Sequence, residues 1–264
     1  MTKSFFKDAI SAIKKGKKFA IFIHINPDGD AVGSAKAIQN LLKTLGKESF
    51  IFCDDKVSFD TTFICDGFDE DQTKLEECDT YICLDISGVA RAGKYQSYLQ
   101  RKDKTVVIID HHVPQDNFGN IVCRDSDSAS TAELVYKLFI EMDAKISAET
   151  ALYLYVGVSS DTGCFVYQNT TAFSHECAAK LIELGADTTK ANYELFVRRP
   201  EDYIDLSKLA FKKLKVYGNK LSIVAIDNRT FKKYHEFSSF YMIDALRFYT
   251  TDVLIIAVQK EKML

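Results

Sequence analysis

The stretch that decides the fold is Phe19-Ala-Ile-Phe-Ile-His24-Ile-Asn-Pro-Asp28-Gly-Asp30-Ala-Val-Gly33-Ser34, in which an apolar run passes into polar residues and then into a helical pattern. The apolar part predicts a buried strand, and the part after the turn predicts a helix. Because open parallel sheets bind ligands where strands end and helices begin, His24, Asp28 and Asp30 are candidate functional residues. The two aspartates are equally suited to cap the helix, and this stretch alone leaves both roles open.

Strand-like and helical patterns alternate along the first part of the chain, which is typical of a parallel α/β sheet. Strands are expected at Phe19–Ile25, Ser49–Cys53, Tyr81–Ile86 and Thr105–Asp110, with helical segments from Asp30 to about Leu45, up to about Gln100, and near 129–142, 147–159 and 172–184. After Gly185 a basic helical stretch around 189–215 leads to strands at Leu221–Ile226 and Val253–Val258, with a helix near 240–248. We therefore expect an α/β fold with a mostly parallel sheet flanked by helices in residues 1–185, and a second, smaller α/β domain in 186–264.

The composition is that of a globular chain, with 47% hydrophobic and 27% charged residues among 264. The longest apolar runs are only strand-sized, so no transmembrane helix is expected, and the N-terminus lacks the apolar core of an export signal. Seven cysteines without a Cys-x-x-Cys pair favour a reducing compartment and argue against a structural zinc site. These features predict a cytoplasmic protein.

The charge is unevenly distributed. Residues 1–185 carry seven more acidic than basic residues, whereas residues 186–233 carry five more basic than acidic residues. An acidic block can hold metal cations and a basic block can meet a phosphate-bearing substrate, although ordinary solvated surface gives the same pattern.

Two further predicted strands end in potential ligands. Asp85 ends one of them, and Asp110, His111 and His112 follow directly from the other. Polar groups that emerge from a buried run cost free energy unless something engages them, so a purely structural role explains these residues poorly. Asp161 closes an apolar helix in Val-Ser-Ser-Asp161-Thr-Gly, where a helix-ending turn at the glycine is the alternative.

Four carboxylates and two imidazoles are thus expected at one edge of the sheet: His24, Asp28, Asp30, Asp85, His111 and Asp161. Without cations the carboxylates would repel one another, and divalent metal resolves that conflict. Carboxylate and imidazole sets without thiolate suit manganese or a similar first-row ion, and this number of ligands is enough for two ions that share one aspartate.

These motifs resemble the DHH phosphoesterase superfamily, and within it the nanoRNase and pAp-phosphatase branch. Ser128-Ala-Ser-Thr-Ala-Glu133, Phe165 and Arg198-Arg199-Pro200 also resemble that branch, and the resemblance covers about residues 5 to 215. It implies a manganese-dependent hydrolase of short 5′-phosphorylated oligoribonucleotides (nanoRNA) or of 3′-phosphoadenosine 5′-phosphate (pAp). The alternatives are a phosphodiesterase of linear or cyclic dinucleotides, an inorganic pyrophosphatase, and a non-catalytic module that binds metal or nucleotide.

The resemblance also implies roles for single residues. His24 and Asp28 would hold one manganese ion, Asp30, His111 and Asp161 the other, and Asp85 would bridge the two, with magnesium or cobalt as substitutes. His112 would face the scissile phosphate, and Asp110 would orient its neighbours, so that these two residues and Asp85 act in catalysis. Arg198 and Arg199 would bind the substrate, a solvated helix end being the alternative reading.

One departure concerns the C-terminal part. The family's second domain ends in a Gly-Gly-Gly-His segment, and this sequence stops at Leu264 without it, so the second domain is expected to be incomplete. The expected partners are short oligoribonucleotides or small nucleotides, with neither a membrane nor long duplex nucleic acid. The content of 19 phenylalanines and 13 tyrosines leaves room for a homodimer face.

Overall fold

The computed structural model describes residues 5–201, 203–218, 220–231, 239–246 and 252–258 of the chain. By its internal contacts the chain divides into two compact units, Met1–Arg198 and Arg199–Leu264.

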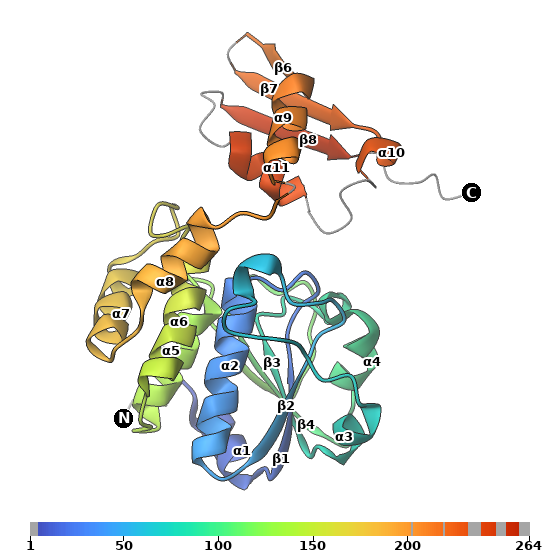
Figure 1. Ribbon diagram of the computed structural model, residues 1–264. Coiled ribbons are helices and arrows are strands. Elements are labelled where there is room, and N and C mark those ends of the chain that lie inside the picture. Colours follow the sequence, from blue (N-terminus) through green and yellow to red (C-terminus); the bar gives the residue numbers. More distant parts are fainter. Residues whose placement is uncertain (1–4, 202, 219, 232–238, 247–251, 259–264) are drawn as a thin grey trace. The chain divides into compact units, whose positions relative to one another are not determined.

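The first unit is built on a five-stranded, entirely parallel sheet in the order β2-β1-β3-β4-β5 (Figure 1). Its strands are β1 (Lys18–Phe22), β2 (Glu48–Phe52), β3 (Thr80–Leu84), β4 (Thr105–Asp110) and β5 (Ile121–Arg124). The sequence predicted the first four, whereas β5 was missed because it is a four-residue edge strand without a clear apolar pattern. Since all strands run the same way, the carboxyl ends of β1, β3 and β4 meet at one edge.

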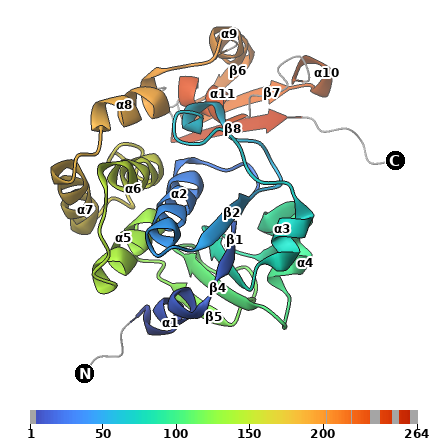
Figure 2. The same ribbon diagram turned by 60° about the horizontal axis from the view of Figure 1, so that its bottom comes forward.

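One face of the sheet packs against most of the helices (Figures 1 and 2). These are α1 (Lys7–Lys15), α2 (Gly29–Thr44), α5 (Thr131–Glu141), α6 (Ala148–Asp161), α7 (Ala172–Glu183) and α8 (Thr188–Asn192), with the short turns η1 (Phe59–Thr61) and η3 (Tyr193–Val197). Their apolar side chains form one continuous core with the sheet, and burial of each large apolar side chain contributes about 1.5–3 kcal/mol to stability. The helices predicted near 129–142, 147–159 and 172–184 are confirmed as α5, α6 and α7.

The opposite face is covered by α3 (Gln72–Glu77), the 3-10 segment η2 (Val89–Tyr95) and α4 (Gln96–Leu99), around a second, smaller core. The sequence predicted one helical segment up to about Gln100. The structure breaks it at Gly93, whose φ of +58° lies in the left-handed region that glycine adopts most readily. This break brings Lys94 N within 2.9 Å of Asp54 Oδ2.

Two glycines allow α2 and α6 to approach each other closely. A Cβ on Gly33 would lie 2.3 Å from the carbonyl oxygen of Tyr153, and a Cβ on Gly157 would lie 2.7 Å from Asp30 Oδ1. Only residues without a side chain fit at such distances. Because α2 carries Asp30 and α6 ends at Asp161, this packing brings two of the predicted ligands toward one place.

The second unit is a mixed three-stranded sheet with helices on one face. Its elements are α9 (Tyr203–Lys213), β6 (Leu214–Tyr217), β7 (Leu221–Ile226), α10 (Asn228–Phe231), α11 (Ser239–Leu246) and β8 (Val253–Val258). Strand β7 pairs antiparallel with β6 and parallel with β8, and the apolar faces of α9 and α11 pack on the sheet. The two strands predicted here are confirmed, and the end of the predicted helix, 247–248, lies outside the described residues.

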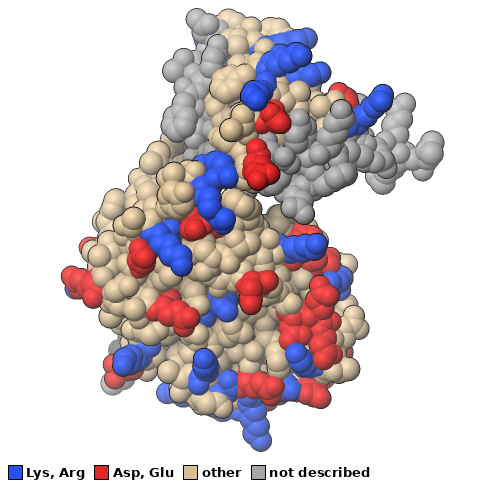
Figure 3. Space-filling model, in the orientation of Figure 1, with Lys and Arg blue, Asp and Glu red and all other residues tan. Residues whose placement is uncertain are grey.

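The basic stretch that was expected to be helical over 189–215 is not one helix. It ends at Val197, resumes at Tyr203 after Pro200, and gives way to β6 at Leu214. Proline explains the gap, because it excludes the residue before it from the helical region and lacks the amide that a helix needs. Figure 3 shows basic side chains, Lys or Arg, near the top of the view. In the sequence, α9 contains Lys208, Lys212 and Lys213, and β6 contains Lys215.

Candidate metal centre

The loop after β1 gives Asp28 two functions at once. Its Oδ1 accepts hydrogen bonds from the backbone amides of Asp30 and Ala31, at 3.0 and 3.1 Å, and so caps α2. Its Oδ2 lies 3.7 Å from His24 Nε2 and faces the site. The two roles that the sequence left open are therefore compatible, because each uses a different oxygen.

Asp30 is completely buried on the first turn of α2. Its two oxygens accept hydrogen bonds from the backbone amides of Thr131, at 2.6 Å, and Ala132, at 2.8 Å, which belong to the first turn of α5. A carboxylate at a helix N-terminus is stabilised both by these amides and by the helix dipole. The burial of this charge is thus supported by α5.

Asp85 follows β3 directly and has a left-handed backbone, with a φ of +61°. Its side chain is 1% exposed and accepts a hydrogen bond from Thr131 Oγ1 at 2.9 Å. One of its oxygens lies 3.2 Å from His24 Nε2, and the other lies 3.5 Å from His111 Nε2. Asp85 therefore stands between the two histidines.

His111 and Asp161 meet although 50 residues separate them in the sequence. His111 Nε2 lies 3.0 Å from Asp161 Oδ2, and the other ring nitrogen, Nδ1, lies 3.2 Å from the carbonyl oxygen of Ser128. Asp161 is placed by the last turn of α6, and Asn169 Nδ2 donates a hydrogen bond to its backbone oxygen.

His112 is held by a group behind it. Asp110 is fully buried; its Oδ1 accepts from His112 Nδ1 at 2.9 Å, and its Oδ2 accepts from Arg124 Nε at 2.8 Å. The His112 side chain is 45% exposed, so its ring is oriented from behind while the other side remains accessible. The sequence did not single out Arg124, because a lone arginine on an edge strand carries no recognisable pattern.

The predicted ligands come together in three overlapping sets whose nitrogen and oxygen atoms lie within 4.8 Å of one another. These are His24, Asp28 and Asp85; Asp30, His111 and Asp161; and Asp85, His111 and His112. The first set joins His24 and Asp28 with Asp85, the second joins Asp30, His111 and Asp161, and Asp85 also faces His111. That these sets hold two ions stays a prediction.

The histidine rings of the site have raised pKa values. Burial opposes the charged forms of His24 and His111, but hydrogen bonds and charges of the neighbouring aspartates outweigh it and raise their pKa values to about 11 and about 9. Hydrogen bonds to Asp110 and Asp85 raise the pKa of His112 to about 10. Without a cation, protons on these rings balance the carboxylates.

The carboxylates differ among themselves. Burial raises the pKa of Asp30 well above its usual value, and the charges of Asp85 and Asp161 add to this. Burial also raises the pKa of Asp161 to about 7, against a hydrogen bond to His111. The pKa of Asp85 is held well below its usual value despite burial, because His112 and His24 hydrogen bond to it. The ionised forms of these buried carboxylates therefore need positive charge close by.

The residues present fit divalent ions. His111 Nε2 is buried between two carboxylates, with Asp161 Oδ2 at 3.0 Å and Asp85 Oδ1 at 3.5 Å, and neither contact has the alignment of a regular hydrogen bond. An imidazole nitrogen that faces carboxylate oxygens in this way is the arrangement that a first-row cation fills. The second nitrogens of His24 and His111 lie near backbone carbonyl oxygens, which is how metal-bound histidines are usually oriented.

The two predicted substrate-binding arginines lie outside these sets. Arg198 Nη2 donates to the carbonyl oxygen of Phe59 at 3.0 Å, and its guanidinium lies 4.0 Å from the centre of the Phe59 ring and pairs with Glu194. In the second unit, the Arg199 guanidinium lies 5.4 Å from the ring centre of Tyr203. Their role in substrate binding stays a prediction.

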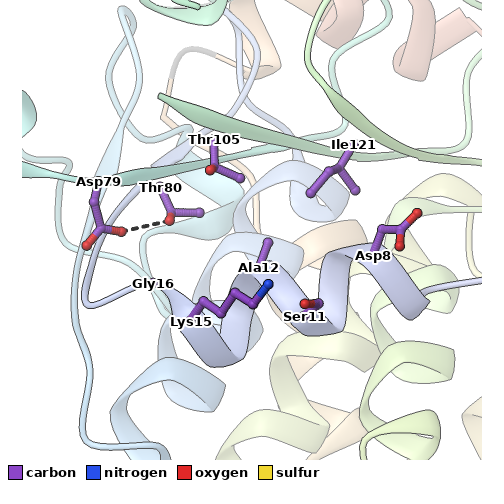
Figure 4. Close-up of a pocket in the computed structure, with 9 residues that line it drawn as sticks. All are labelled: Asp8, Ser11, Ala12, Lys15, Gly16, Asp79, Thr80, Thr105 and Ile121. Atoms are coloured by element: carbon purple, nitrogen blue, oxygen red, sulfur yellow. Dashed lines mark hydrogen bonds between the residues drawn. The ribbon is translucent and has the colours of Figure 1, made fainter. Parts of the chain in front are cut away.

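A surface cavity lies at the other edge of the sheet, near the amino ends of β1, β3, β4 and β5 (Figure 4). It is lined by Lys15, Asp8 and Asp79 among others. Asp79 already accepts hydrogen bonds from the amide of Lys17 and from Thr80 Oγ1. Because parallel sheets bind ligands at the carboxyl ends of their strands, this cavity is not the candidate site.

The carboxyl edge of the parallel sheet thus carries a candidate metal centre built from acid and imidazole side chains. Residues 18–158 match the DHH family, N-terminal domain, and the chain belongs to the DHH family. No helix in the described part of the chain is long and apolar enough to cross a membrane.

The chain is similar in sequence to two Mycoplasma proteins. An uncharacterized protein of Mycoplasma genitalium, MG371, is 28% identical over 92% of this chain and 74% of its own length. The bifunctional oligoribonuclease and PAP phosphatase NrnA of Mycoplasma pneumoniae is 28% identical over 83% of this chain and 68% of its own length.

Among solved structures, an exopolyphosphatase-related protein from Bacteroides fragilis superposes with a TM-score of 0.84 at 20% identity, covering 96% of this chain and 79% of its own. The exonuclease RecJ bound to manganese gives a TM-score of 0.54 at 13% identity, covering 98% of this chain and 81% of its own. These two likenesses concern the fold.

Proposed function

We propose that this protein is a manganese-dependent phosphoesterase that hydrolyses short 5′-phosphorylated oligoribonucleotides and pAp. The observation that carries the proposal is the meeting of two acid and imidazole sets around Asp85 at the carboxyl edge of a parallel sheet. The substrate class is supported by the similarity to NrnA. Manganese is supported by the thiolate-free donor set and by the ion bound to RecJ, which has a similar fold.

In this proposal His24 and Asp28 would hold one ion, Asp30, His111 and Asp161 would hold the other, and Asp85 would serve both. When bound, two such ions lower the pKa of water and stabilise the charge on the attacking and departing oxygens of phosphoryl transfer. The remaining steps, which are orientation of the substrate and proton transfer, are assigned to protein side chains.

His112 is the proposed proton donor to the departing oxygen. Asp110 and Asp85 raise the pKa of its ring, which favours the charged form, and its exposed side can reach a substrate. Asp110 fixes the orientation of the ring, and Arg124 holds Asp110 in turn. A charged imidazole at this place also favours an anionic phosphate over a neutral ester.

The test is a panel of substrates offered to the purified chain with manganese, with magnesium or with a chelator. The panel consists of pAp, di- to pentaribonucleotides, a linear and a cyclic dinucleotide, and pyrophosphate. We expect metal-dependent release of phosphate from pAp and shortening of the oligonucleotides. Hydrolysis of pyrophosphate alone, or turnover that persists in chelator, would refute the proposal.

Two variants make the panel specific to the site. Asp161→Asn removes a proposed ligand and should abolish turnover. Asp143→Asn makes the same chemical change at an exposed turn and should leave turnover as in the wild type. Equal activity of the two variants would contradict the assignment of the site.

A further inference from the structure

Arg91 lies beside the metal centre, and the backbone that carries His24 fixes its position. Arg91 belongs to η2, which follows β3 and Asp85 along the chain. Its carbonyl oxygen accepts a hydrogen bond from the amide of Ile25 at 2.8 Å, and its own amide donates to Gly88 at 2.9 Å. The loop that presents His24 therefore also places Arg91.

The guanidinium of Arg91 has no acidic partner among the described residues. Its Nη2 lies 2.9 Å from His24 Nδ1, and its side chain is partly exposed. By contrast, Arg124 pairs with Asp110, and Arg101 pairs with Glu76 and Asp103. A guanidinium offers five N–H donors, and so most of those of Arg91 remain available to an external acceptor.

His24 has a second partner for the nitrogen that Arg91 contacts. His24 Nδ1 also lies 2.8 Å from the carbonyl oxygen of Ile25, while Nε2 faces Asp85 and Asp28. The Arg91 guanidinium can therefore turn to an external acceptor while His24 Nδ1 keeps the Ile25 carbonyl oxygen as its partner.

We propose that Arg91 binds a phosphate oxygen of the nucleotide substrate at the His24 side of the centre. Guanidinium groups form short, charge-assisted and often bidentate hydrogen bonds with phosphate. His24 contacts Oδ2 of Asp85, and His112 contacts Oδ1. Because Arg91 lies beside His24, Arg91 and His112 would contact the substrate from different sides of Asp85. This inference rests on the proposed phosphoesterase function and adds a residue that discriminates phosphate esters from uncharged ones.

Binding of inorganic phosphate and of AMP to the manganese-loaded protein tests the inference, because it requires no turnover. Calorimetry would compare the wild type with Arg91→Ala, Arg91→Lys and a control, Lys94→Ala. Lys94 carries the same charge three residues along, but its ammonium pairs with Asp54 at 3.3 Å. Manganese content, measured by mass spectrometry after dialysis, and thermal unfolding would be recorded for every variant.

We expect Arg91→Ala to bind phosphate about 10- to 100-fold more weakly with unchanged manganese content. Arg91→Lys should bind it about 3- to 10-fold more weakly, since lysine keeps the charge without the planar fork. Lys94→Ala should change the affinity by less than about threefold. For nucleotide hydrolysis, KM should rise in Arg91→Ala in the same proportion as the phosphate dissociation constant.

Unchanged phosphate affinity in Arg91→Ala would overturn the inference, and so would a manganese-loaded wild type that binds no phosphate. Loss of manganese together with phosphate affinity in Arg91→Ala would also overturn it, because Arg91 would then only support His24. A wild type that binds phosphate through Arg91 but hydrolyses no nucleotide would refute the proposed function and support the phosphate site.

Discussion

Asp85→Asn keeps the size of the side chain but removes a negative charge that three histidine rings approach. His24 Nε2 lies 3.2 Å, His112 Nδ1 3.3 Å and His111 Nε2 3.5 Å from the Asp85 oxygens. The Asp85 side chain is only 1% exposed, so solvent cannot compensate for the loss of its charge. Both proposed ion positions therefore weaken together.

The expected magnitude follows from this geometry. A hydrogen bond to a charged group is worth about 1.5–3 kcal/mol, which corresponds to about 10- to 100-fold in affinity, and we use this value for each contact that Asp85 would make with an ion. Because the substitution weakens one ligand at each of two ions, the combined cost is about 3–6 kcal/mol, and turnover should fall by about 10²- to 10⁴-fold.

Metal content after equilibrium dialysis against manganese, read by mass spectrometry, is the direct assay. The control is Asp28→Asn, because Asp28 belongs to one set only and its side chain is 49% exposed. We expect two ions in the wild type, one in the control and fewer than one in Asp85→Asn. If Asp85→Asn retains both ions at wild-type affinity, or loses only as much as Asp28→Asn, the shared position of Asp85 is wrong.

Four further results are expected. Gly33→Ala places a methyl carbon 2.3 Å from the Tyr153 carbonyl oxygen and should lower the urea-derived free energy of unfolding by about 1–3 kcal/mol, whereas Gly67→Ala, with open space around it, should change it by less than about 0.5 kcal/mol. Asp110→Asn should leave the metal content intact but lower kcat by about 10- to 100-fold, because asparagine has a single acceptor oxygen and cannot accept from both His112 and Arg124; unchanged kcat would contradict this role. Manganese affinity should rise with pH from about 6 to 9, because rings with pKa values of about 9 to 11 must lose protons to bind, and calorimetry in buffers of different ionisation enthalpy should detect proton release. Removal of the ions by a chelator should lower the melting temperature, since ligand at 100 times its dissociation constant adds about 2.7 kcal/mol of stability; an unchanged melting temperature would show that no tight site exists.

Much of the fold and of the cluster was predictable because both depend on short patterns. Apolar runs mark buried strands, and a polar residue directly after such a run lies at the carboxyl edge whatever the rest of the chain does. This is why Asp85 and His111 were expected to meet and do so. The alternation of strands and helices then sets the parallel topology.

The features that were missed depend on residues distant in sequence. Arg124 and Arg91 are single arginines in an edge strand and a turn, and only the folded chain brings them to Asp110 and His24. The break in η2 depends on one left-handed residue, Gly93, inside an otherwise helical pattern. Neither the residue type nor the spacing in the sequence predicts these contacts or this break.

Asp30 is a proposed ligand and also links two helices. Its carboxylate, on α2, accepts hydrogen bonds from the backbone amides of Thr131 and Ala132 on α5. Exchanging it for another donor would detach the start of α5 from α2 as well as alter the coordination. Efforts to re-engineer the protein for a different ion have a better starting point in Asp28, at the solvent-facing rim, where the structural loss is that of a helix cap, about 1 kcal/mol. Asp30, on the buried side of the centre, therefore tolerates substitution poorly because it also links the two helices, whereas Asp28, on the solvent-facing side, can be changed at lower structural cost.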